Sequence, residues 1–188
     1  MVASREGTDK VCADETNFSD TCIPLEDLLT LLKAADRMDD AIVFQEAIKE
    51  IWKAHTSKAL RSQLDQGIAD VIRGKAATAV ETFKSLKEKD NQYAEAWNKV
   101  AACEYMLGNR APSLAAAKKV VEMIPTHFQA HNGVGLCAYD SGLYEEAAAA
   151  FRRSLELDPW SPVSSKLAAC VDMLNRQKGT TEKEIEKP

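Results

Sequence analysis

Apolar side chains return with a helical period along most of the chain. In residues 144–157, Ala147, Phe151 and Leu155 stand four positions apart, so they share one face of a predicted helix. Comparable stretches cover residues 25–36, 39–52, 60–73, 94–107, 128–141 and 163–176. Only 8 Gly and 6 Pro leave little room for the many tight turns of an all-β protein. The pattern therefore predicts an all-α fold.

The same residue types recur at a spacing of 34 positions, which is the main sign of internal organisation. Glycine stands at positions 74, 108 and 142, and small residues stand at 67, 101 and 135 and again at 79, 113 and 147. Phenylalanine stands at 83 and 151 with alanine at 117, and proline stands at 125 and 159 with asparagine at 91. The sequence therefore predicts three copies of one helical hairpin, at residues 60–93, 94–127 and 128–161.

Each recurring position has a physical task in such a hairpin. The glycines at 74, 108 and 142 follow the first helix, where a residue in the left-handed conformation ends it. The small residues let two helices approach closely, and Phe83 and Phe151 fill the space between neighbouring hairpins, whereas Ala117 leaves the middle hairpin less filled. Proline ends the second helix because it cannot continue one.

At these positions the sequence resembles the tetratricopeptide repeat (TPR) family, whose 34-residue unit has small, aromatic and proline signature positions. The resemblance covers residues 60–161, and Trp97 stands at the family's tryptophan position. The sequence departs from the family pattern at Glu104, Ala117 and Asn91. The resemblance implies an all-α, right-handed solenoid of TPR-type helical hairpins.

The flanking segments are expected to complete this solenoid. Residues 22–57 form a predicted helical hairpin without the signature spacing, which we interpret as an N-terminal cap. Residues 162–177 form a predicted C-terminal capping helix, which would cover the last apolar face of the solenoid. The polar and charged segments 1–21 and 178–188 are expected to be mobile tails.

The resemblance also implies a function, because the first helices of TPR hairpins line a concave groove that holds a peptide or an extended partner segment. The candidate peptide-binding residues at the matching positions are Arg61, Leu64, Glu95, Asn98, Tyr105, Gln129, Asn132 and Tyr139, with Lys166 from the capping helix. Asn98 and Asn132 can bracket a peptide backbone, since an amide both donates and accepts hydrogen bonds. The alternative is that these positions are solvated or covered by this chain's own tail.

One activity of the family depends on specific residues. Cochaperones with TPR domains hold the acidic tail of heat-shock chaperones in a carboxylate clamp of Lys, Asn and Arg side chains. At the corresponding places this sequence has Leu64 and Ile68, then Lys99, then Gln129 and Gly133. None of these matches, and Glu95 in the groove would repel a carboxylate. We therefore expect a protein or peptide partner, but not a carboxylate-clamp cochaperone.

Composition and charge narrow the partners further. The chain has 188 residues with 24 Lys+Arg and 29 Asp+Glu, and its formal net charge of −5 argues against nucleic acid as a partner. No apolar run approaches the length of a membrane helix, so no membrane insertion is expected, and residues 1–20 do not resemble a signal peptide. Five scattered cysteines suggest reduced thiols. These features predict an intracellular protein in the cytoplasm or, after processing, in an organelle.

The search for catalytic chemistry yields only weak candidates. The sequence has no phosphate-binding loop, dinucleotide fingerprint or nucleophile elbow. His127 and His131 have the spacing of two zinc ligands on one helix, but no acid or cysteine stands at a nearby ligand spacing. We interpret both as structural histidines, and Cys103 and Cys137 as small buried residues. No enzyme activity, cofactor or metal is therefore expected.

These observations predict a non-catalytic protein–protein interaction module, an adaptor or assembly factor that binds an extended peptide segment in the concave groove. The alternative is a structural subunit that is docked permanently in a larger complex or self-associated. A docked subunit should expose a broad apolar patch or form a stable oligomer.

Overall fold

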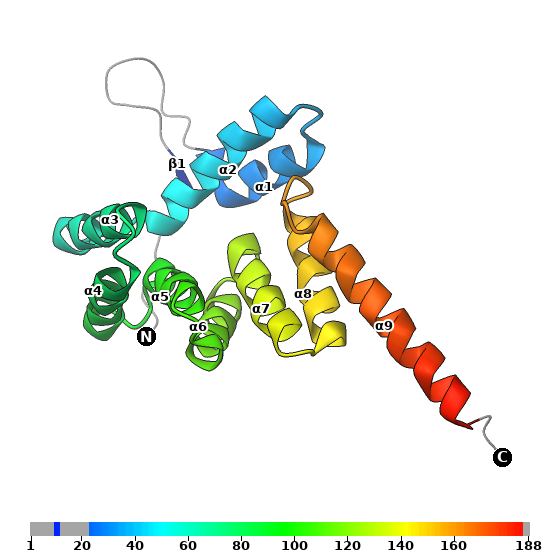
Figure 1. Ribbon diagram of the computed structural model, residues 1–188. Helices are drawn as coiled ribbons and strands as arrows, with labels where there is room; N and C mark the ends of the chain where they lie inside the picture. The colour runs from blue at the N-terminus through cyan, green and yellow to red at the C-terminus, as the bar shows by residue number, and fades with distance from the viewer. Residues whose placement is uncertain (1–9, 12–22, 186–188) are drawn as a thin grey trace, which may run out of the picture.

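The computed structural model describes residues 10–11 and 23–185, with the side chains of residues 23–177. Three pairs of antiparallel helices follow one another along the chain, as the 34-residue period predicts (Figure 1). The pairs are α3 (Lys58–Ile72) with α4 (Ala76–Lys89), α5 (Ala94–Met106) with α6 (Arg110–Met123), and α7 (Phe128–Asp140) with α8 (Tyr144–Leu157). The described part of the chain is an all-α solenoid, as predicted.

The recurring glycines end the first helices as the sequence indicates. Gly74, Gly108 and Gly142 have φ angles of 75°, 87° and 74°, which place them in the left-handed region that a residue without Cβ adopts at no steric cost. In the second repeat, the N–H of Asn109 donates a hydrogen bond to the carbonyl of Glu104 at 2.8 Å, and the other two repeats have the equivalent bond. This backbone bond closes a helix C-terminus in the Schellman manner.

The small residues of the first helices touch the recurring phenylalanines. A Cβ placed on Gly67 would lie 2.5 Å from Phe83 Cε1, and one placed on Gly135 would lie 2.5 Å from Phe151 Cε1. Both rings are completely buried. Each phenylalanine therefore packs directly onto the backbone of the first helix of its own repeat.

Substituting Gly135 with Ala is expected to lower the free energy of unfolding by about 1–3 kcal/mol, because the added methyl group forces the buried Phe151 ring to move. The matched control is Gly133→Ala on the same helix, where the new Cβ would meet only Ala117 Cβ, at 3.4 Å. Urea denaturation of both variants measures the difference. An equal effect of the two substitutions would contradict the packing of Phe151 on Gly135.

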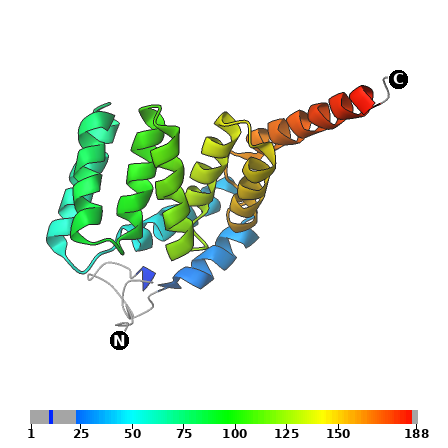
Figure 2. The same cartoon turned by 90° about the horizontal axis from the view of Figure 1, so that it is seen from below.

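The N-terminal hairpin consists of α1 (Leu25–Ala34) and α2 (Met38–Lys53), and it does not lie over the end of the first repeat as a cap would. Figure 1 shows it crossing above the row of repeats, and Figure 2 shows it running across their ends. Its apolar residues, among them Leu32 and Ile48, form one core with Phe128 and Leu157 of the third repeat. The physical reason is that the apolar face of the hairpin finds its partners where one repeat joins the next.

The hairpin segment contacts both junctions between repeats and the end of the third repeat. After α2, His55 Nε2 lies 2.9 Å from Asp90 Oδ2 at the first junction. Trp52 stacks on His127 at the second, with ring centroids 3.7 Å apart. Gln45 Nε2 donates to both carboxylate oxygens of Asp158, just after α8 at the end of the third repeat, at 2.9 and 3.0 Å. The N-terminal hairpin therefore acts as a brace across all three repeats.

The two ends of the chain differ in part from the expected boundaries. Within the predicted N-terminal tail, β1 (Lys10–Val11) pairs antiparallel with β2 (Ile23–Pro24). The last helix, α9 (Ser164–Ile185), packs on α8 and extends past the predicted end at residue 177 (Figure 1). Cys12, Cys22 and the remaining residues of both predicted tails lie outside the described part of the chain.

Candidate peptide-binding groove

A cavity of about 330 Å³ lies between the first helices of the second and third repeats, α5 and α7, with α6 behind it. Its polar residues are Asn98, Lys99, Gln129 and Asn132. Its small and apolar residues are Ala101, Ala102, Met106, Ser113, Ala117, Gly133 and Leu136, and Tyr105 completes the lining. We call this space the groove cavity. It has the size and the mixed lining of a small ligand site, apolar with a few convergent polar groups.

The positive charge of Lys99 at the groove cavity is balanced by the carboxylate of Glu95. Its Nζ lies 2.7 Å from Oε1 of Glu95, one turn earlier on α5, and the Glu95 side chain is only 2 % exposed. Burial alone would raise the pKa of Glu95, but the Lys99 ammonium and the hydrogen bond from His127 outweigh it and lower that pKa to about 2. Glu95 is therefore an anion at neutral pH, and the pair adds no net charge to the groove cavity.

His127 holds the other oxygen of Glu95 from the start of α7. The ring is completely buried, and its Nδ1 accepts a hydrogen bond from the Ala130 N–H at 3.2 Å, so it caps the helix. Since Nδ1 accepts, the ring proton sits on Nε2, which donates to Glu95 Oε2 at 3.2 Å. His127 is a structural histidine, as its sequence context indicates.

The two asparagines at the groove cavity have different environments. Asn98 is nearly buried, and its Nδ2 donates to Glu95 Oε2 at 3.0 Å and to Gln129 Oε1 at 3.5 Å. Asn132 Nδ2 donates to Ser161 Oγ at 3.1 Å, while its Oδ1 is buried and accepts no hydrogen bond from any described residue. Buried polar atoms almost always have partners, so Asn132 is a polar group with unused capacity beside the cavity.

Tyr105 lines the groove cavity and is held in place by its neighbours. Its hydroxyl donates to Asp140 Oδ2 at 2.9 Å, and the guanidinium of Arg110 stacks on its ring at 3.9 Å. Arg110 Nε also donates to Asp140, at 2.6 Å. Burial and the nearby Asp140 carboxylate raise the pKa of Tyr105. The side chain therefore offers a fixed aromatic surface to a ligand.

The structure divides the residues that the sequence singled out. Asn98, Tyr105, Gln129 and Asn132 line the groove cavity together. Tyr139 lies elsewhere, against Tyr144 and below the Lys166 ammonium, which sits 5.1 Å from the ring centroid. Arg61 lines a second cavity of about 450 Å³ between α2 and α3, with Lys53, Glu50 and Asp65 among its neighbours.

Two of the predicted binding residues are removed from the accessible surface. Leu64 is 1 % exposed and belongs to the core of the first two repeats, because α4 and α5 cover its side of α3. Glu95 is enclosed by Lys99, Asn98 and His127. Lys99 was not among the predicted binding residues, because the sequence related it only to the carboxylate clamp, but in the structure it lines the groove cavity. The only feature of the sequence that indicated the groove cavity was Ala117, which stands where the other two repeats have phenylalanine.

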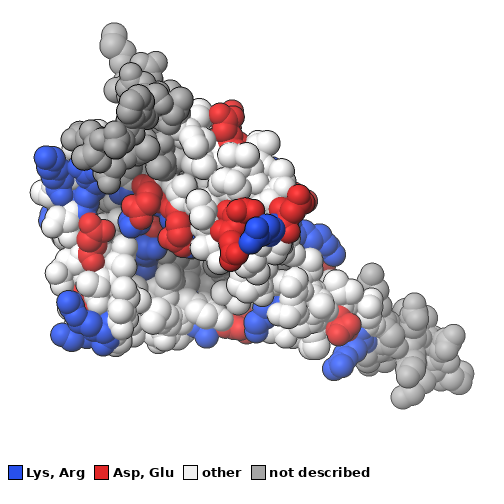
Figure 3. All heavy atoms as spheres, turned by 90° about the horizontal axis from the view of Figure 1, so that it is seen from above, with Lys and Arg blue, Asp and Glu red and all other residues white. Residues whose placement is uncertain are grey.

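In the part of the chain that the structure describes, we find no second candidate site on the charged face of Figure 3 or at the buried thiols. Figure 3 shows acidic and basic side chains interspersed on the face seen from above, without a field of one sign. Burial raises the pKa of Cys103 to about 11, and Cys137 and Cys170 are also buried. Among the described residues, no group of three or more His, Cys, Asp and Glu side chains is arranged to hold a metal ion. None of the helices in this part of the chain combines the length and apolar character of a transmembrane segment.

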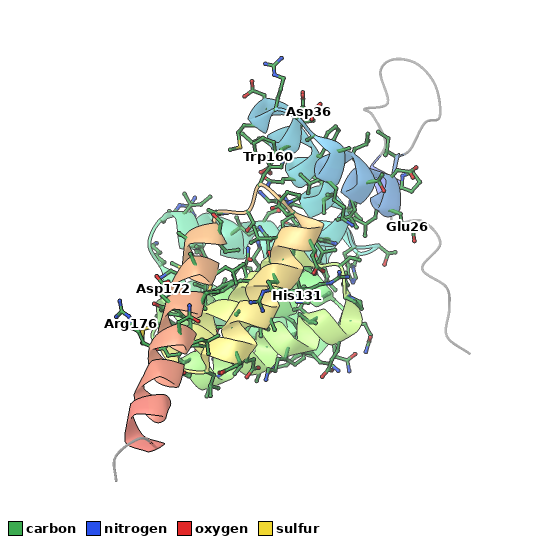
Figure 4. The ribbon with its side chains drawn as sticks, turned by 90° about the vertical axis from the view of Figure 1, so that its right-hand side faces the viewer. Glu26, Asp36, His131, Trp160, Asp172 and Arg176 are labelled. Atoms are coloured by element: carbon green, nitrogen blue, oxygen red, sulfur yellow. The ribbon has the colours of Figure 1, made fainter. Side chains whose placement is uncertain are left out.

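Figure 4 shows how the outer residues are distributed around this core. Trp160 points toward the N-terminal hairpin from the loop after α8, where it packs against the shared core of α1, α2 and the third repeat. Asp172 and Arg176 lie on α9, which runs beside the repeats at the left of the view, whereas Glu26 and Asp36 belong to the hairpin segment above the repeats. The third repeat is therefore covered from two sides, by the hairpin and by α9.

Known proteins support this description of the fold. A family model described as "Tetratricopeptide repeat" matches residues 108–162. The first TPR domain of Spaghetti (RPAP3), bound to an HSP90 peptide, is similar with a TM-score of 0.59 at 18 % identity, over 62 % of this chain and 95 % of that one. The type III secretion chaperone SycD of Yersinia enterocolitica, in complex with a peptide of the translocator YopD, has a TM-score of 0.55 at 18 % identity, over 67 % and 97 %.

A third similar structure is the TPR domain of Sgt2 from Aspergillus fumigatus, with a TM-score of 0.57 at 16 % identity, over 70 % of this chain and 87 % of that one. At these identities the likeness concerns the fold. No curated protein matches the sequence significantly.

Proposed function

We propose that this protein, whose three hairpins are tetratricopeptide repeats, is a non-catalytic interaction module that binds an extended segment of a partner protein across the groove cavity. The observation that carries the proposal is the convergence of Asn98, Gln129, Asn132 and Tyr105 on one cavity between α5 and α7. Side-chain amides can hydrogen-bond to a peptide backbone of any sequence, and a fixed tyrosine supplies contact area at little entropic cost.

The charge balance of the groove cavity suggests what kind of segment it takes. Of the described residues that line it, Lys99 carries the only positive charge, and that charge is paired with Glu95. A carboxylate ligand would have to compete with Glu95 for the Lys99 ammonium. We therefore infer an internal, uncharged stretch of polypeptide rather than an acidic chain terminus. The HSP90 and YopD peptides bound by the similar structures are ligands of those proteins; they support the general use of this fold for peptide binding.

The test uses the full-length chain to select binders from a displayed library of random linear peptides. We expect the Gln129→Ala/Asn132→Ala variant to lose at least about tenfold in affinity for the selected peptides, since it removes two polar partners of about 1 kcal/mol each. The control is Arg152→Ala, an exposed residue of α8 that does not line the groove cavity. Fluorescence polarisation gives the affinities, and circular dichroism checks the fold of each variant.

Selected peptides that bind the groove variant as tightly as the unmodified chain would contradict this function. The alternative of a docked structural subunit would then be favoured, and the N-terminal hairpin offers a surface for it. Leu31, Met38, Ile42 and Val43 are all at least 41 % exposed on α1 and α2. Sedimentation of the full chain at several concentrations would then report whether this surface drives self-association.

A further inference from the structure

The three repeats fill the same interior position differently. In the first repeat Phe83 packs on Gly67, and in the third Phe151 packs on Gly135. The second repeat has Ala117 in the phenylalanine position and Ala101 in the glycine position. These two differences are linked. In the first and third repeats, a Cβ on the glycine that faces the phenylalanine would lie 2.5 Å from the ring, so an alanine fits there only where the ring is absent. The middle repeat thus has a methyl group where its neighbours have an aromatic ring, and the residue that faces it has a methyl group where they have none.

The groove cavity lies where this ring is missing. Its lining includes Ala101, Ala117, Ser113 and Gly133, which come from the small-residue positions behind the groove. In the first and third repeats the corresponding place is occupied by the completely buried ring of Phe83 or Phe151. An apolar cavity of about 150 Å³ is already large enough to admit benzene, and the groove cavity measures about 330 Å³.

The polar atoms at the back of the groove cavity are already paired. Ser113 Oγ donates to the carbonyl of Ala101 at 2.7 Å and accepts from Cys137 Sγ at 3.3 Å. A polar side chain that reached this depth would lose its water and find few free partners, whereas an apolar one would gain the full benefit of burial. Gln129 and Asn132 are half-buried, whereas Ser113 and Ala117 are buried, so a peptide backbone could reach the two amides without entering the back of the cavity.

We propose that the groove cavity is a socket for one large apolar side chain, aromatic or branched aliphatic, of the bound segment, which takes the place of the phenylalanine that the second repeat lacks. This inference rests on the proposed function and adds the chemistry of the partner. The bound segment completes the core of the middle repeat with its own anchor residue. Residues on either side of the anchor bind through their backbone to the amides of Gln129 and Asn132.

The key variant fills the socket from within. Ala101→Gly/Ala117→Phe recreates the pair that the neighbouring repeats use, so it is expected to fold with a Tm no lower than that of the unmodified chain. Ala101→Gly alone is the reference for the stability of the filled variant, and Arg152→Ala, which lies outside the groove cavity, is the control for binding. The probe is a set of N-acetylated, C-amidated linear peptides chosen by library selection on the full chain, each remade with every residue in turn replaced by Ala.

We expect one apolar position in each peptide to dominate, with a loss of about thirtyfold or more in affinity when it becomes Ala, as for a buried hot-spot residue. The filled variant should lose a similar factor, and Arg152→Ala, which does not change the lining of the groove cavity, should bind like the unmodified chain. Toluene supplies an independent probe. In NMR spectra of the full chain it should shift the methyl signals of Ala101 and Ala117, whereas the spectrum of the filled variant should not respond to it.

The outcomes separate the socket from the groove. Peptides that depend on Gln129 and Asn132 but have no dominant apolar residue would overturn the socket and leave the proposed function intact. A folded filled variant that binds the peptides with unchanged affinity would also overturn it. If the filled variant does not fold, the alanine scan of the peptides and the toluene titration still decide the question. Absence of both peptide and toluene binding would overturn the socket and the proposed function together.

Discussion

Replacing Glu95 with Gln is expected to lower the free energy of unfolding at neutral pH by about 3 kcal/mol. Glutamine has the shape of the protonated acid, so the substitution removes the charge and little else. The ionised carboxylate is held by Lys99 and His127, which lower its pKa from 4.5 to about 2 in the folded chain. Each pKa unit corresponds to about 1.4 kcal/mol of stabilisation of the ionised form. Urea denaturation at pH 7 measures the loss.

The dependence on pH follows from the direction of this pKa shift. A carboxylate whose pKa is lowered by folding stabilises the folded state at every pH above its unfolded value of 4.5, and this contribution is lost as the pH falls from 4.5 toward 2. The unmodified chain and Glu95→Gln should therefore differ most at neutral pH and converge in stability as the solution is acidified. The convergence identifies the charge, since a packing defect would persist at low pH.

The matched control for this prediction is Glu88→Gln. Glu88 is an exposed glutamate on α4, and its substitution should change stability by less than about 0.5 kcal/mol at any pH. If Glu95→Gln behaves like Glu88→Gln at pH 7, the buried ion pair does not contribute as described.

Replacing Trp52 with Ala is expected to lower the free energy of unfolding by about 3–5 kcal/mol, as large-to-small changes of buried aromatic residues do. Trp52 is 5 % exposed, stacks on His127 and lies 4.9 Å from the Phe128 ring centroid. It is the residue through which α2 holds the second repeat junction, so its loss should release the N-terminal hairpin from the repeats. Thermal unfolding should show a Tm lower by about 2–4 °C for each kcal/mol lost.

A control on the same helix separates docking from helix formation. Ile42 is 47 % exposed, and Ile42→Ala should change stability by about 0.5 kcal/mol or less. Hydrogen exchange adds a local readout, because the amides of α1 and α2 should exchange faster in Trp52→Ala than those of α5 to α8. Uniform protection across the chain, or equal effects of the two substitutions, would contradict the brace.

The repeat itself could be predicted from the sequence because its determinants are local. Each determinant acts within one hairpin. A glycine adopts a positive φ, a proline ends a helix, and a phenylalanine packs on the glycine that faces it. Their spacing is therefore visible in the sequence, and the φ angles of Gly74, Gly108 and Gly142 confirm it. Ala117 was equally visible in the sequence as a departure from the repeat pattern. That it borders an open space was visible only in the structure, from the volume and lining of the groove cavity.

The candidate site was only partly predictable, because position within a repeat does not determine exposure. Arg61, Glu95 and Gln129 share one position in successive first helices. Arg61 is exposed and Gln129 is half-buried, whereas Glu95 is almost completely buried. The difference comes from His127, which contacts Glu95 from the next repeat junction and is itself covered by the stacked ring of Trp52 from α2.

The sequence by itself determined the helices, their pairing into three hairpins and the end of each first helix. All of these depend on contacts between residues that are near one another in the chain or one repeat apart. Only the tertiary structure decided where the N-terminal hairpin lies, which polar residues of the first helices stay accessible, and that the space beside Ala117 joins the groove. These features depend on surfaces that form only after the repeats have stacked, so no local pattern in the sequence records them.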